Sequence, residues 1–173
     1  MSGKTQRIVV LGVGSELYGD DAVGVVVARR VKQMDLGPNV EVIEGHTGGL
    51  NLLFDMEGAD WAIVVDAVDF GGQPGEICVF EAEDADLVMA RRVASLHHVS
   101  LADVLELGRE TGITPRVTVV GIQPGVKGFG RELSEAVAQQ VEAAAQAVVD
   151  LVASCRDGSD CGRTHAQDGG ATC

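Results

Sequence analysis

Residues 7–21 read RIVVLGVGSELYGDD, and this stretch decides the fold. Its first half is an apolar, β-branched run that ends in glycines, a pattern typical of a buried parallel strand. Its second half ends in Asp20 and Asp21, just before an apolar helical pattern over residues 22–34. Acidic residues favour the start of a helix because they face its positive end. The stretch therefore predicts a strand, a glycine loop and a helix, in that order.

The same alternation continues along the chain. The further predicted strands are 40–43, 61–65, 76–80 and 117–122. The further predicted helices are 50–56, 81–92, 101–110 and 132–153. Strands that alternate with helices predict the α/β class, with a mostly parallel, twisted sheet of about five strands and helices on both faces.

The length of 173 residues suits one hydrophobic core. We expect residues 1–153 to form a single α/β domain. Residues 154–173 are rich in glycine and polar residues without periodicity, and we expect them to be a disordered tail. Cys78 falls in a strand-like run, where we expect a small core residue. The other three cysteines fall at residues 155–173, so we do not expect a disulfide framework.

Composition excludes several classes of protein. The chain is 46% hydrophobic, too apolar for an intrinsically disordered protein. Its 13 basic residues face 26 acidic ones, and the net charge of −13 is the wrong sign for binding nucleic acid or an anionic membrane. We find neither a signal peptide nor an apolar run long enough for a membrane span, and we expect a cytoplasmic monomer.

Chemistry-bearing side chains follow the predicted strands. Ligands of parallel α/β sheets bind outside the carboxyl ends of the strands. Asp20 and Asp21 follow the first strand, and Asp66 follows the third. His97 and His98 lie in the connector before the helix that starts at residue 101. Two carboxylates and one imidazole suit a borderline divalent metal such as nickel or zinc.

Each of these residues also has a purely structural interpretation. Asp20 or Asp21 can be the N-cap of the following helix, Asp66 can be a turn residue, and a surface histidine can simply be solvated. A nucleotide-binding loop is a further alternative. However, Leu17 replaces the third glycine of the dinucleotide fingerprint, and the loop's acidic residues would repel a pyrophosphate.

Several motifs follow one another along the chain: VLGVG at 10–14, GDDAVG at 19–24, EGHTGG at 44–49, VDA at 65–67, and SLHH at 95–98 before LADVL at 101–105. In these motifs and their order the chain resembles the hydrogenase maturation endopeptidases, which trim the C-terminal extension from the large subunit of [NiFe] hydrogenases. The resemblance covers approximately residues 8–151.

The resemblance implies a metal-dependent endopeptidase with three residues, Asp21, Asp66 and His97, as both metal ligands and catalytic residues. Asp21 is preferred to Asp20, and His97 to His98, by their positions in the family's motifs. The implied metal is nickel carried by the substrate, for which other divalent metals can substitute. The implied partner is the large-subunit precursor of a [NiFe] hydrogenase.

The sequence departs from the family's pattern at two positions. Ser15 stands where family members commonly have asparagine, and His46 stands where glycine is frequent. Serine can still make one hydrogen bond in the loop, and His46 adds an imidazole near the site. A non-catalytic nickel-binding accessory protein is the alternative function, since it would need the same ligands.

Overall fold

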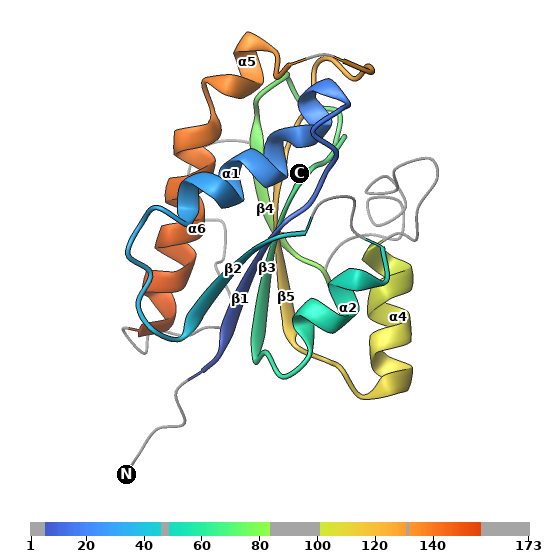
Figure 1. Cartoon of the computed structure of the whole chain (residues 1–173), viewed down its shortest axis with the longest axis vertical. Helices are drawn as coiled ribbons and strands as arrows, with labels where there is room; N and C mark the ends of the chain where they lie inside the picture. The colour runs from blue at the N-terminus through green and yellow to red at the C-terminus, as the bar shows by residue number, and fades with distance from the viewer. Residues whose placement is uncertain (1–5, 46–48, 84–100, 131, 157–173) are drawn as a thin grey trace.

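The computed structural model describes residues 6–45, 49–83, 101–130 and 132–156. One sheet has the strand order β2-β1-β3-β5-β4 (Figure 1). β1, β2, β3 and β5 are parallel, and β4 pairs antiparallel with β5 at the edge. The strands are β1 (Ile8–Gly12), β2 (Val40–Glu44), β3 (Trp61–Ala67), β4 (Ile77–Glu81) and β5 (Arg116–Ile122). The predicted mostly parallel sheet of five strands is confirmed.

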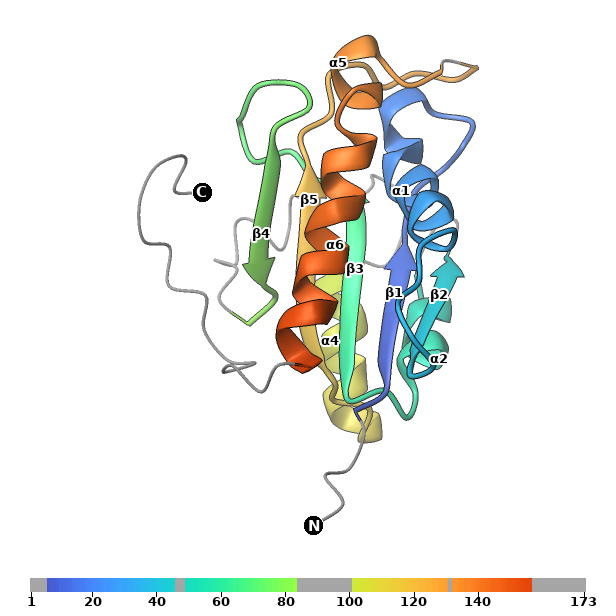
Figure 2. The same ribbon diagram turned by 90° about the vertical axis from the view of Figure 1, so that its left-hand side faces the viewer.

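Helices cover both faces of this sheet, also as predicted. α1 and α6 pack on one face, and α2 and α4 pack on the other (Figures 1 and 2). A short 3-10 helix, η1, leads directly into α1. The helices are η1 (Gly19–Ala22), α1 (Val23–Val31), α2 (Asn51–Met56), α4 (Leu101–Thr111), α5 (Glu135–Ala138) and α6 (Val141–Arg156).

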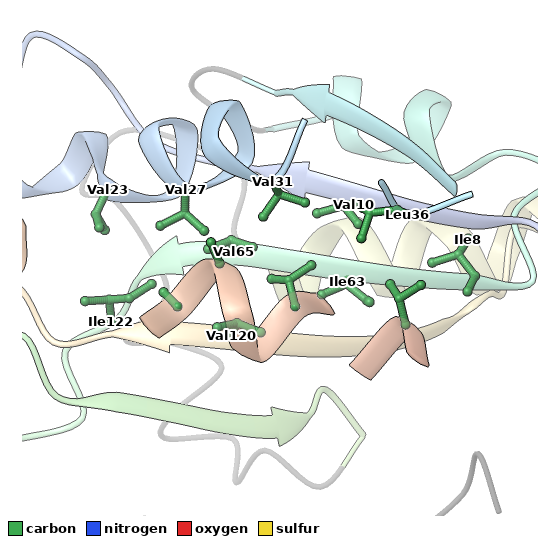
Figure 3. Packing of buried hydrophobic residues seen from close by; sticks show 14 of the residues in the cluster. Ile8, Val10, Val23, Val27, Val31, Leu36, Ile63, Val65, Val120 and Ile122 are labelled. Atoms are coloured by element: carbon green, nitrogen blue, oxygen red, sulfur yellow. The ribbon is translucent and has the colours of Figure 1, made fainter. Parts of the chain in front are cut away.

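The central strands β1 and β3 are buried along their whole length. Both of their faces touch helices, so a continuous apolar run suits them better than an alternating one. In Figure 3, Val10 of β1 and Ile63 of β3 lie in the same cluster as Val27 and Val31 of α1, and Val120 of β5 lies beside α6. Full burial of a valine or isoleucine side chain contributes about 1.5–3 kcal/mol. This packing makes the carboxyl ends of β1 and β3 a firm base for the loops above them.

Gly24, in the first turn of α1, lets the helix lie directly on the sheet. A Cβ atom at this position would meet the carbonyl oxygens of Val13 and Val65. These two residues also join β1 to β3, because the Val13 amide donates to the Val65 carbonyl at 2.8 Å. The start of α1 is therefore held against the ends of both central strands.

Two predicted helices differ from the structure. The predicted helix 132–153 is divided into α5 and α6, because the Gln140 amide bonds three residues back, to the Val137 carbonyl, at 3.0 Å. α6 then continues past Ala153 to Arg156. The predicted helix 81–92 is wrong at its first residue, since Glu81 is the last residue of β4. Residues 84–92 of that helix lie outside the described residues, as do residues 157–173 of the expected tail.

Cys78 is buried in β4, as expected for a small core residue. Both Cys78 and Cys155 are disulfide-bonded, which the sequence analysis did not expect, since it inferred no disulfide framework. Within the described ranges, no helix is both long and apolar enough to span a membrane.

Candidate metal and catalytic site

Asp66 lies near the carboxyl end of β3, where it pairs in register with Gly121 of β5. β3 extends to Ala67, so Asp66 is the penultimate residue of the strand and not a turn residue after it. Only 9% of the residue is exposed. Its Oδ1 accepts a hydrogen bond of 2.8 Å from the amide of Ala67. The side chain is thus a buried acid at the edge of the sheet where ligands bind.

Asp21 reaches the same edge from the loop after β1. It belongs to η1 and is partly exposed, and its Oδ2 accepts a hydrogen bond of 2.9 Å from the amide of Ser15. Gly14 makes this approach possible with a φ of 136°, a backbone conformation that favours glycine. A Cβ atom at Gly14 would meet the carbonyl oxygen of Asp21. The glycine loop therefore folds back on itself to set the Asp21 carboxylate in place.

Asp21 and Asp66 form an acid pair. Burial is the largest cause that raises the pKa of Asp66 from its ordinary 3.8 to about 8, and the negative charge of Asp21 raises it further. The Ala67 amide and the charge of Lys127 act in the opposite direction. The Asp66 carboxyl consequently holds a proton at neutral pH, unless a cation arrives to stabilise its charged form.

Asp20, the neighbour of Asp21, has a different role. It is fully buried, and four donors bond to its carboxylate. Oδ2 accepts from the Gly125 amide at 2.8 Å, the Val126 amide at 2.7 Å and the Ser134 hydroxyl at 2.8 Å, and Oδ1 accepts from the Ser134 amide at 2.6 Å. A carboxylate offers about four lone-pair sites, so Asp20 has little capacity left for a metal.

These hydrogen bonds also decide the charge of Asp20. Burial alone would raise its pKa, but the bonds from Val126, Ser134 and Gly125 together bring the pKa below its ordinary value. Asp20 is therefore an ionised, fully bonded carboxylate that clamps the segment after β5 to η1. The structural interpretation of these acids as N-caps is wrong, because the residues that cap η1 and α1 are Tyr18 and Ala22, without side-chain bonds.

The predicted histidines cannot be placed in this site. His97 and His98 lie in the range 84–100, and His46 lies in 46–48, both outside the described residues. The described residues contain no group of three or more histidine, cysteine, aspartate or glutamate side chains suited to hold a metal. The structure thus brings together two of the three predicted residues, Asp21 and Asp66.

The sequence analysis missed Lys127, whose charge acts on Asp66, and Ser134, which supplies two bonds to Asp20. Both follow β5, another strand whose carboxyl end lies at the same edge. It missed Gln123 as well, whose Oε1 accepts from the amides of Phe70 at 3.0 Å and Gly72 at 3.1 Å. The rule that sites lie after parallel strands could have drawn attention to residues 123–134.

The arrangement suits a divalent cation. Two carboxylates that repel each other offer oxygen ligands, and a cation between them would remove the repulsion and replace the proton on Asp66. An imidazole from outside the described residues would make a mixed oxygen and nitrogen donor set, which borderline metals prefer. The two carboxylates present therefore suit a divalent cation, and nickel stays a prediction from the sequence.

The comparisons with known proteins give one answer. The family model of hydrogenase maturation proteases (HycI) matches residues 25–151. The hydrogenase expression/formation protein HupD of Rhodobacter capsulatus is 38% identical over 86% of this chain and 72% of its own. The hydrogenase 2 maturation protease of Escherichia coli K12 is also 38% identical, over 68% of this chain and 73% of its own.

A solved structure agrees with the sequence matches. The hydrogenase maturating endopeptidase HybD of E. coli superimposes with a TM-score of 0.72 at 33% identity, over 88% of this chain and 94% of its own. The match includes the α/β fold described above and extends beyond the residues of the family model. The chain therefore belongs to the hydrogenase maturation protease family.

Proposed function

We propose that this protein is the endopeptidase that removes the C-terminal extension of a [NiFe] hydrogenase large-subunit precursor, and that nickel already bound to the precursor is its recognition element. Membership in the family supports the protease activity. The nickel-dependent part of the proposal is supported by the acid pair.

One observation carries that part. Asp66 is buried beside Asp21, and its pKa is raised to about 8. Such a pair is poorly stabilised by the protein alone, and it gains most from a cation that approaches from outside. A nickel ion presented by the precursor would meet two carboxylates, with His97 as the third proposed ligand.

Two roles of the nickel are compatible with these ligands. The ion can polarise the scissile carbonyl or lower the pKa of the attacking water. Alternatively it serves only to hold the precursor, and a carboxylate of the acid pair acts as general base. In both cases Asp21 and Asp66 bind the ion and place the peptide bond beside themselves.

The charge of the chain favours a checkpoint on nickel loading. With a net charge of −13 and two carboxylates at the site, the enzyme gains affinity for its substrate when a cation lies between the two. We expect the loaded precursor to be cut much faster than the empty one. Equal rates for the two forms would contradict the checkpoint.

The test is the intact mass of a large-subunit precursor incubated with this protein, with and without nickel loading. We expect a nickel-dependent loss of a short C-terminal peptide. Asp21→Asn and Asp66→Asn should each slow the cleavage by about a thousandfold, since each removes a charged ligand. Glu142→Gln, on the solvent side of α6, is the matched control and should cleave normally.

Binding of the loaded precursor without any loss of mass would favour the alternative, a non-catalytic nickel-binding accessory protein. The cytoplasmic location and the monomeric state expected from the sequence are further parts of the proposal. Sedimentation of the purified protein tests the second.

A further inference from the structure

Four large apolar side chains are exposed on the two loops beside the acid pair. Leu17 is 61% exposed, Tyr18 49%, Val126 45% and Phe129 73%. Leu17 and Tyr18 lie in the loop between β1 and η1, and Val126 and Phe129 lie in the segment between β5 and α5. We call this set the apolar rim.

The apolar rim is a built surface, because the two loops are bonded to each other. The Gly130 amide donates to the Leu17 carbonyl at 2.8 Å, and the Asp20 amide donates to the Val126 carbonyl at 2.9 Å. The rings of Tyr18 and Phe129 meet edge to face, with centroids 5.8 Å apart. Both loops lie at the end of the sheet where η1 and α5 stand, in both views (Figures 1 and 2). Beneath the rim, the buried Asp20 carboxylate accepts four hydrogen bonds and so joins η1 to the segment after β5.

The apolar rim is continuous with the acid pair on both sides. The Asp21 amide donates to the carbonyl of Tyr18, at 3.3 Å. Lys127, the residue after Val126, acts on Asp66 through its charge. The rim therefore borders the acid pair, where a chain whose peptide bond lies at the pair could reach it.

The charges around the rim are of both signs. Glu16 is paired with Arg29 of α1 at 3.0 Å, and Lys127 is exposed beside Val126. Glu132 is exposed further along the same segment. The rim itself is apolar, and such a surface beside a catalytic site suits an apolar peptide segment.

We propose that the apolar rim binds an apolar segment of the precursor next to the scissile bond, so that it, and not the metal alone, determines which chain enters the site. This inference rests on the proposed function. It adds a second element of recognition: the rim would bind the protein chain, and the acid pair would bind the cation.

The test compares Phe129→Gln and Leu17→Gln with Phe54→Gln. Phe54 is a matched control because it is 69% exposed on α2, which packs on the other face of the sheet from α1 and α6. Since all three side chains are exposed, the variants should melt within about 3 °C of the wild type. We expect each rim variant to raise KM for the loaded precursor about tenfold, as expected for the loss of an apolar contact at an interface, with little change in kcat. The control should leave both constants unchanged.

Direct binding of the loaded precursor, measured by calorimetry, separates the two proposals. Cleavage by the wild type with an unchanged KM in Phe129→Gln would overturn the rim and leave the function standing. Suppose instead that binding weakens about tenfold in Phe129→Gln and that neither the wild type nor any variant cleaves the precursor. This result would support the rim and overturn the protease function. Equal weakening in Phe54→Gln, or a dimer that Phe129→Gln converts to a monomer, would overturn the rim as a binding site for the precursor.

Discussion

Two aspartates at the same edge of the sheet, Asp20 and Asp66, are both buried and yet differ in charge. Asp20 is 0% exposed and accepts four hydrogen bonds, and its pKa lies below the ordinary value. Asp66 is 9% exposed and, among the described residues, accepts one hydrogen bond, from Ala67. Its pKa is raised to about 8.

The comparison shows that burial alone does not decide the charge of a carboxylate. Hydrogen-bond donors also decide it, because each N–H or O–H that points at the carboxylate stabilises its ionised form. Asp20 has its donors within the chain and serves the fold. Asp66 has one such donor among the described residues, the Ala67 amide, and it faces the like charge of Asp21. It is therefore the acid that a bound cation or a proton would stabilise most.

The largest effect on stability should come from Asp20→Asn. The asparagine amide group would turn an N–H₂ donor toward amides and a hydroxyl that also donate, which leaves buried donors without acceptors. We expect a loss of about 3 kcal/mol, as for a buried charged partner. For a chain of this length that lowers Tm by about 6–12 °C, measurable by circular dichroism.

The pH dependence of this effect has a definite sign. Because the folded-state pKa of Asp20 is lowered, its stabilisation is present above the ordinary pKa of 3.8 and is lost as the pH falls through the folded value. The gap in Tm between wild type and Asp20→Asn should therefore shrink in acid. Ser134→Ala is the milder control. A gap in Tm that widens in acid would contradict the role of the ionised Asp20 carboxylate in holding η1 to the segment after β5.

Asp66→Asn should have the opposite effect on stability, and one that depends on pH. The folded-state pKa of Asp66 is raised, so the stability associated with its proton is fully present below 3.8 and is lost as the pH rises through about 8. Asparagine resembles the protonated acid at every pH. We expect the variant to melt with the wild type near pH 4 and above it at pH 8.5, with a gap in Tm that opens as the pH rises toward 8.

Asp21→Asn sharpens this experiment. It removes the like charge but leaves the burial, which is the larger cause of the raised pKa. It should therefore raise Tm at pH 8.5 by less than Asp66→Asn does. An equal or larger rise would mean that charge repulsion, and not burial, dominates at the acid pair.

The smallest effect should come from Glu142→Gln. Glu142 makes two hydrogen bonds to Arg30, at 2.7 and 3.0 Å, and these lower its pKa, but its side chain is 64% exposed. Solvent screens an exposed ion pair, so its contribution to stability is small. We expect Tm to change by less than about 2 °C. A larger loss of Tm would show that the two hydrogen bonds between Arg30 and Glu142 stabilise the fold in spite of their exposure to solvent.

Much of the fold could be predicted from the sequence, because the apolar runs of β1 and β3 and the helical spacing in α1 are local patterns. The antiparallel pairing of β4 with β5 could not be predicted, since no local feature of residues 77–81 indicates which strand pairs with them. The break between α5 and α6 lies at Gln140, whose amide donates to the Val137 carbonyl three residues back. Local patterns predicted the elements, and tertiary contacts decided their ends.

The site, too, could be predicted only in part. Asp21 and Asp66 could be predicted as candidates because they follow strand sequences, and the preference for Asp21 came from the family resemblance. The role of Asp20 could not be predicted, because its donors lie at residues 125–134, more than a hundred positions along the chain. His97 stays a prediction, as it lies outside the described residues.

Gly24 has a consequence for how this site can vary in evolution. The spacing between η1, which holds Asp21, and the end of β3, which holds Asp66, depends on a residue with no side chain. Adding one methyl group there would push α1 off the carbonyls of Val13 and Val65 and widen the gap between two acids that it does not touch. The spacing of the acid pair thus depends on a position that has no side chain and belongs to neither acid.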